Sequence, residues 1–171
     1  MFTSKNASPI PIYKCYYFVY WKDRFINYAK SNRAMNNPHS LQEWFMTWAK
    51  NRCAVRGETL ENGTNEYNNL IRNGETTTGV IIQNQLTKET LPFLQQHVYL
   101  VIGNNYENLK TVLIFWNELA KNQNLCILFV NPISSEKWIV YPYTHNRISE
   151  KATLEKGLRS LMDAVPQWSQ N

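Results

Sequence analysis

Two short, wholly apolar runs in the second half of the chain constrain its fold more than any other feature. They are VYLVI at 98–102 and LCILFV at 125–130. Each is too short to be a typical helix and long enough to be a strand that is buried on both faces. The stretch between them, 106–121, carries apolar residues at helical spacing. Strand, helix and strand in this order predict a parallel β-α-β unit.

The segments around this unit predict further elements of the same sheet. GVIIQN at 79–84 has the composition of a strand, and a short helix is predicted near 88–96. A tight turn at 131–136 leads into an antiparallel strand at 138–141, and an amphipathic helix is predicted over 150–165. The expected fold is therefore α/β (or α+β), with a small mixed sheet, helices packed on it and a helical N-terminal portion.

Composition divides the chain into three parts. Residues 1–56 are basic and rich in aromatic residues, residues 57–77 are polar and contain three glycines, and residues 78–171 hold the predicted α/β elements. Polar stretches with several glycines are typical of loops, so 57–77 is predicted to be a loop or linker. Together the three parts are expected to form one compact domain.

Within the first part, a helix is predicted over 41–55. Ser40 and Glu43 have the spacing of a capping box, and apolar residues follow on one helical face. For residues 12–22 both readings stay open. The apolar stripe over 12–30 favours a helix, whereas the aromatic run YKCYYFVYW favours a strand.

Charge is distributed unevenly along the chain. Residues 1–56 contain nine Lys and Arg against two acids, a net of +7, and residues 57–171 contain nine against eleven, a net of −2. The first part also contains twelve of the 23 aromatic residues. Cations neutralise phosphates and aromatic rings stack on bases, so this pattern is typical of a surface that faces a polyanion. Lys22 and Arg52 project from otherwise apolar faces, where each must snorkel, pair with an acid or serve a site.

The sequence therefore predicts a non-catalytic binding module for nucleic acid or an acidic protein partner. The residues predicted to make this surface are Lys22, Arg24, Lys50, Arg52, Arg56, Tyr20 and Tyr28.

An enzyme is the first alternative. Gly103, Asn104 and Asn105 follow the predicted strand 98–102 and precede a helix, which is a place where anions bind in parallel sheets. His145 and Arg147 follow the last predicted strand and could act as a general base and an anion clamp. If both groups met at one end of the sheet, they would suit a metal-independent hydrolase or a nucleotide-using enzyme.

A second alternative is a protein-interaction accessory factor or effector. In that case an exposed Trp44, Trp48 or Trp168 would anchor a partner. Neither a metal nor a cofactor is expected. The chain has only two aspartates, its apolar strands carry no carboxylate, and no pair of histidines has the spacing of zinc ligands.

Three features bear on location. Cys15, Cys53 and Cys126 form no CxxC pair, the N-terminus lacks the pattern of a signal peptide, and no uninterrupted apolar run reaches the length of about 20 residues that a membrane-spanning helix needs. The sequence therefore predicts a cytoplasmic protein with no membrane span.

Overall fold

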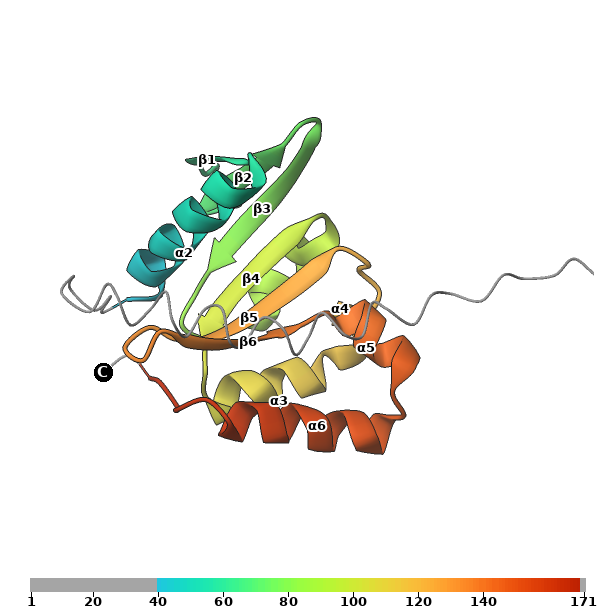
Figure 1. Ribbon diagram of the computed structural model, residues 1–171. Helices are drawn as coiled ribbons and strands as arrows, with labels where there is room; N and C mark the ends of the chain where they lie inside the picture. Colours follow the sequence, from blue (N-terminus) through green and yellow to red (C-terminus); the bar gives the residue numbers. More distant parts are fainter. Residues whose placement is uncertain (1–39, 170–171) are drawn as a thin grey trace, which may run out of the picture. The chain divides into compact units, whose positions relative to one another are not determined.

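The computed structural model describes residues 40–169, which belong to the second of two compact units, Asn37–Asn171. This unit has an α/β fold built on one six-stranded mixed sheet (Figure 1). Its elements in chain order are α2 (Leu41–Arg56), β1 (Thr59–Asn62), β2 (Asn69–Asn73), β3 (Thr76–Ile82), the 3₁₀ helix η2 (Lys88–Gln95), β4 (Val98–Gly103), α3 (Tyr106–Ile114), α4 (Trp116–Leu119), β5 (Leu125–Asn131), β6 (Glu136–Val140), α5 (Pro142–Ile148) and α6 (Lys151–Asp163).

The strands lie side by side in the order in which the chain makes them, β1 to β6. The first three form an antiparallel meander, β3, β4 and β5 are parallel, and β6 returns antiparallel to β5. The predicted parallel β-α-β unit is β4–α3–α4–β5, and the predicted hairpin is β5–β6, so both predictions are confirmed.

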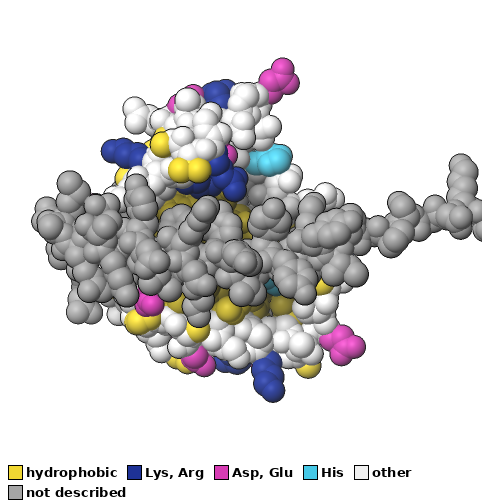
Figure 2. All heavy atoms as spheres, viewed as in Figure 1, with side chains coloured by type: hydrophobic (Ala, Val, Ile, Leu, Met, Phe, Trp, Pro, Cys, Tyr) yellow, Lys and Arg dark blue, Asp and Glu magenta, His cyan; other side chains and the backbone are white. Residues whose placement is uncertain are grey.

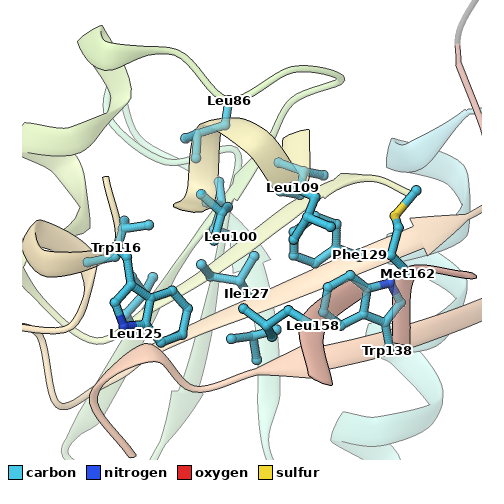
Figure 3. Close-up of a cluster of buried hydrophobic side chains, with 14 of the residues drawn as sticks. Leu86, Leu100, Leu109, Trp116, Leu125, Ile127, Phe129, Trp138, Leu158 and Met162 are labelled. Atoms are coloured by element: carbon cyan, nitrogen blue, oxygen red, sulfur yellow. The ribbon is translucent and has the colours of Figure 1, made fainter. Parts of the chain in front are cut away.

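Side chains alternate between the two faces of the sheet, as strand geometry requires. On one face the sheet packs against η2, α3, α4 and α6, and Figure 3 shows Leu100, Ile127 and Trp138 among the buried side chains there. The rings of Phe129 and Trp138 are stacked with their centroids 4.0 Å apart. The alternate residues of the same strands, such as Val101 and Leu128, belong to the cluster on the other face, which contains α2.

The predicted helix 41–55 is confirmed as α2. The Ser40 hydroxyl accepts a hydrogen bond from the Glu43 amide at 3.2 Å, which satisfies one of the unpaired N–H groups of the first turn. Gly57 ends the helix with φ of 66°, a left-handed conformation that glycine adopts without strain. The buried residues of α2 share one face, namely Leu41, Trp44, Phe45, Ala49 and Cys53. This face attaches the helix to the sheet.

The loop or linker predicted for residues 57–77 is wrong, because this stretch forms β1, β2 and the start of β3. These strands bury little apolar surface, and in β2 only Ile71 and Asn69 are buried. One glycine of this stretch serves the sheet instead of interrupting it, because Gly74 makes the two-residue turn between β2 and β3 at φ of 56°. Just beyond the stretch, Gly79 makes room for the Tyr67 ring, which lies 2.5 Å from where a Gly79 Cβ would be.

Two boundaries in the second half also differ from prediction. The helix predicted over 106–121 is broken at Phe115 into α3 and α4. After this break the Trp116 ring is buried and its indole N–H donates to Asn146 Oδ1 at 2.9 Å. The stretch with His145 and Arg147, in which no element was predicted between the strand 138–141 and the helix 150–165, is the helix α5. It begins at Pro142, because proline has the backbone φ that a first helical residue needs.

Candidate functional site

The predicted anion-binding residues lie at the carboxyl end of β4, where Asn104 is fully buried. The Asn104 side-chain amide donates to the carbonyls of Val165 and Pro166, at 2.8 and 3.1 Å. Its side-chain oxygen accepts the Trp138 indole N–H at 2.6 Å, and its backbone carbonyl accepts the Trp168 N–H at 2.8 Å. Asn104 therefore fixes the segment after α6 to the end of the sheet.

Gly103 and Asn105 take part in the same arrangement. The Trp168 ring comes within 2.8 Å of where a Gly103 Cβ would be, so a side chain at position 103 would collide with it. Asn105 caps α3 by accepting the Asn108 N–H at 2.9 Å, and it donates to the Trp168 carbonyl at 3.3 Å. The polar side chains predicted to bind an anion therefore make their hydrogen bonds within the chain.

Two further asparagines at this end were missed by the sequence analysis. Asn108 is fully buried, donates to the carbonyls of Asn84 and Gly103 and accepts the Leu86 N–H, all within 2.9 Å. Asn131 donates to the Pro166 carbonyl at 3.0 Å. An amide can donate and accept at once, so it suits loops that present both carbonyls and N–H groups. The sequence signal was weak, because Asn131 directly follows an apolar run and Asn108 lies in the first turn of α3.

His145 and Arg147 lie at the opposite end of the sheet from Gly103. Gly103 is in register with Val130 near the end of β5, whereas Val140, which precedes α5, is in register with Ile127 near its start. The enzyme alternative required these groups to meet at one end, and the structure does not bring them together.

The polar groups of the His145 and Arg147 side chains contact residues close to them in sequence. His145 Nδ1 lies 2.8 Å from the Tyr141 carbonyl and 3.2 Å from its amide nitrogen, within the first turn of α5. Arg147 donates to the Tyr143 hydroxyl at 2.8 Å and lies over that ring. Both residues therefore interact within their own helix.

Among the predicted surface cations within residues 40–169, Arg52 makes the most contacts with other side chains. It forms an ion pair with Glu58, whose side chain is only 4% exposed, and donates to the Tyr99 hydroxyl at 2.8 Å. Its guanidinium carbon also lies 5.1 Å from the centroid of the Tyr99 ring and 5.7 Å from that of Trp48. Among the three possibilities open for Arg52, the structure shows pairing with an acid.

The other predicted cations of α2 are more accessible. Arg56 is 51% exposed and reaches the second oxygen of Glu58 at 3.9 Å, and Lys50 is exposed. On the face seen in Figure 2, the Lys and Arg side chains of the described residues lie in several separate places. Four predicted residues, Tyr20, Lys22, Arg24 and Tyr28, lie outside the described residues.

The tryptophans of the interaction alternative differ in accessibility. Trp44 is 5% exposed and Trp168 is 6% exposed, so both belong to the core. Trp48 is partly exposed, stacks on Trp44 with centroids 5.9 Å apart and meets the edge of Tyr99. An anchor that uses an exposed Trp44 or Trp168 is therefore not supported by this structure.

Near Arg52 lie the buried thiol of Cys126, at the start of β5, and the phenol of Tyr141, which directly follows β6. Burial raises the pKa of Cys126 from its ordinary 9.0 to about 12, against smaller opposing effects of the hydrogen bond to Tyr141 and the charge of Arg52. Burial likewise raises the pKa of Tyr99 and of Tyr141. A nucleophilic cysteine needs a lowered pKa, so this thiol does not suit catalysis.

These raised pKa values predict a loss of stability at alkaline pH. Between pH 9 and about 12 the Cys126 thiol keeps its proton in the folded protein and loses it in the unfolded chain. The unfolded state then binds fewer protons, so the free energy of unfolding falls as pH rises through this window. Urea unfolding at a series of pH values measures the slope, and Cys126→Ala should make it shallower. An unchanged slope in the variant would contradict the prediction.

No group of three or more His, Cys, Asp and Glu side chains among residues 40–169 could hold a metal ion. Within the same range, no helix is both long and apolar enough to cross a bilayer. Surface hollows of about 290 and 380 Å³ are lined by residues 63–68 and by the exposed side of α6, and no predicted site residue lines either. Compared with protein-family models, curated proteins and solved structures, the chain matches none of them.

Proposed function

We propose that the protein is a non-catalytic module that binds nucleic acid, with most of the binding charge supplied by residues 1–39. One observation carries the proposal. Residues 40–169 contain twelve Lys and Arg and twelve Asp and Glu, so the described part of the chain has no net charge. Residues 1–39 contain six Lys and Arg and one acid, which accounts for the whole net charge of +5.

Aromatic content favours nucleic acid over an acidic protein partner. Residues 1–39 hold nine of the 23 aromatic residues. A nucleic acid offers bases on which such rings stack, a contribution of about 1–3 kcal/mol per base. An acidic protein surface offers the same charge without that stacking, so it explains the cations and not the rings.

The contacts of α2 show which of its predicted cations remain available for a ligand. Arg52 is committed to Glu58 and Tyr99, so it is expected to support the fold and not the ligand. Lys50 and Arg56 are exposed and remain suited to phosphate contacts. A cytoplasmic location is part of the same proposal, because cysteines such as Cys53 and Cys126 stay unpaired in a reducing compartment.

The proposal predicts that binding to fluorescent single-stranded DNA and RNA weakens steeply with salt. Lys22→Ala/Arg24→Ala should weaken binding, and the slope of log K against log salt should become shallower by about 0.7 for each phosphate that is no longer neutralised. Tyr20→Ala/Tyr28→Ala should weaken binding without changing that slope, because stacking releases no counterions. Fluorescence anisotropy at several salt concentrations measures both quantities.

The matched control is Lys110→Ala/Lys156→Ala, which removes two exposed cations from α3 and α6. It should bind like the parent. If the control lost as much affinity as Lys22→Ala/Arg24→Ala, the loss would follow from the overall charge of the protein, and the proposal would be contradicted. Binding to poly-glutamate with an affinity equal to that for oligonucleotides would favour an acidic protein partner instead.

A further inference from the structure

The chain contains two Asn-Gly pairs, and both lie in the antiparallel meander. Asn62 is the last residue of β1, and Asn73 is the last residue of β2. Each closes its ladder, Asn62 opposite Asn69 and Asn73 opposite Thr76. Both asparagines and the glycines after them are exposed. The two pairs therefore share their sequence, their exposure and their place in a strand.

An Asn-Gly pair can modify itself without an enzyme. The backbone nitrogen of glycine, after losing its proton to a base, attacks the side-chain carbonyl carbon of asparagine. A C–N bond forms to that carbon, the bond to the side-chain nitrogen breaks, and ammonia leaves. Water then opens the cyclic imide at either carbonyl to give aspartate or isoaspartate. The glycine nitrogen must approach the side chain, so the backbone at the pair must be free to rotate.

The two pairs differ in how much free space surrounds the glycine. A Cβ built on Gly63 would lie 1.9 Å from the Tyr67 carbonyl oxygen and 2.3 Å from that of Asn68. The next residue is tied to the same loop, because the Thr64 N–H donates to the Tyr67 carbonyl at 2.9 Å. The Gly63 backbone is therefore enclosed by its own loop, and rotation there would require the loop to open.

Gly74 has none of this enclosure. Among the described residues other than Gly74 and its two chain neighbours, no heavy atom lies within 4 Å of a Cβ built on it. It stands at the tip of a two-residue turn, and the Asn73–Thr76 pair is the last of its ladder. Opening that one pair frees the backbone, and the ends of ladders open far more often than their centres.

We propose that Asn73 is a site of spontaneous deamidation and that the fold protects Asn62. The product places a new carboxylate at the β2–β3 turn, and the isoaspartate form also lengthens the backbone by one carbon at the closing pair of the hairpin. The net charge of the protein falls by one for each molecule modified.

The test is to incubate the full chain at mildly alkaline pH, once folded and once in concentrated urea. Peptide mapping by mass spectrometry then measures conversion at each asparagine. In the folded protein Asn73 should convert about tenfold faster than Asn62, the ratio that a conformational barrier of about 1.4 kcal/mol produces. In urea the two rates should become similar, because the fold no longer encloses either pair.

A matched variant tests whether the fold causes the difference. The loop 63–68 encloses the Gly63 backbone, so replacing residues 64–66 by a flexible Gly-Ser stretch, with Tyr67 kept over Gly79, should raise conversion at Asn62 and leave Asn73 unchanged. Asn73→Gln should remove the signal at 73 without affecting the other site. Equal rates in the folded protein, faster conversion at Asn62, or a tenfold difference that persists in urea would each overturn the proposal.

Discussion

Asn104→Ala should lower the free energy of unfolding by about 3–5 kcal/mol, because each buried polar group left without a partner costs about 1–3 kcal/mol. The substitution leaves the Trp138 indole N–H without its acceptor and the Val165 carbonyl without its Asn104 donor in the interior. The Pro166 carbonyl keeps only the hydrogen bond from Asn131. It also removes one of the side-chain anchors of the segment that holds Trp168 against Gly103, while the backbone bond from Trp168 and the bonds from Asn131 stay. Urea unfolding followed by tryptophan fluorescence measures the loss.

Two variants show that the loss comes from the buried amide. Asn51→Ala removes an exposed asparagine of α2 and should change stability by less than about 0.5 kcal/mol. Asn104→Asp keeps the size of the side chain and an acceptor for the Trp138 indole N–H. It replaces the amide nitrogen, which donates to the carbonyls, by a carboxylate oxygen that cannot donate. It should therefore be nearly as damaging as Asn104→Ala. A cost for Asn104→Ala no larger than that for Asn51→Ala would contradict the role given to this residue.

Arg52→Met should cost about 3 kcal/mol, near the lower end for removing one partner of a buried ion pair. The Glu58 side chain that it leaves behind is 4% exposed, and Arg56 is the one other cation paired with it among the described residues, at 3.9 Å. Methionine preserves most of the contact with the Trp48 and Tyr99 rings, so the loss reports mainly on charge. Urea unfolding of the single and double variants measures it.

The double variant Arg52→Met/Glu58→Gln should recover about 2 kcal/mol, because the uncompensated carboxylate is gone. Arg72→Met provides the matched control, since the side chains of its pair with Glu61 are 47% and 39% exposed and solvent screens their attraction, so its loss should cost far less than that of Arg52. Equal costs for Arg52→Met and Arg72→Met would contradict a structural role for Arg52. The double variant should still bind oligonucleotides like the parent.

The central strands could be predicted from sequence, because a strand that is buried on both faces consists almost entirely of apolar residues. The run LCILFV predicted such a strand, and every residue of β5 is buried. The strands β1 and β2 could not be predicted in the same way. The strand β1 pairs with β2, and β2 pairs with β3 and packs Ile71 in the cluster that contains α2. Neither β3 nor α2 is visible as a neighbour in a polar stretch with glycines.

The candidate site was less predictable than the fold. Sequence left three possibilities for Arg52, and its partner Glu58 lay in the stretch interpreted as a loop. The asparagines after β4 had the right position for an anion site, and their actual partners are carbonyls about 60 residues further along the chain. Pairing over such separations depends on the path of the chain, and side-chain type alone does not encode it.

The attachment of residues 162–168 to the carboxyl end of the sheet also bears on the order of synthesis. A nascent chain that has emerged only as far as β6 presents the Asn104 amide without the carbonyls of Met162 and Val165 to which it later donates. Closure of this end must wait for α6 and the turn beyond it, and contacts between residues so distant in sequence form slowly. Until then the growing polypeptide exposes the apolar surface that Met162 and Trp168 eventually cover, which is the kind of surface that chaperones bind during translation.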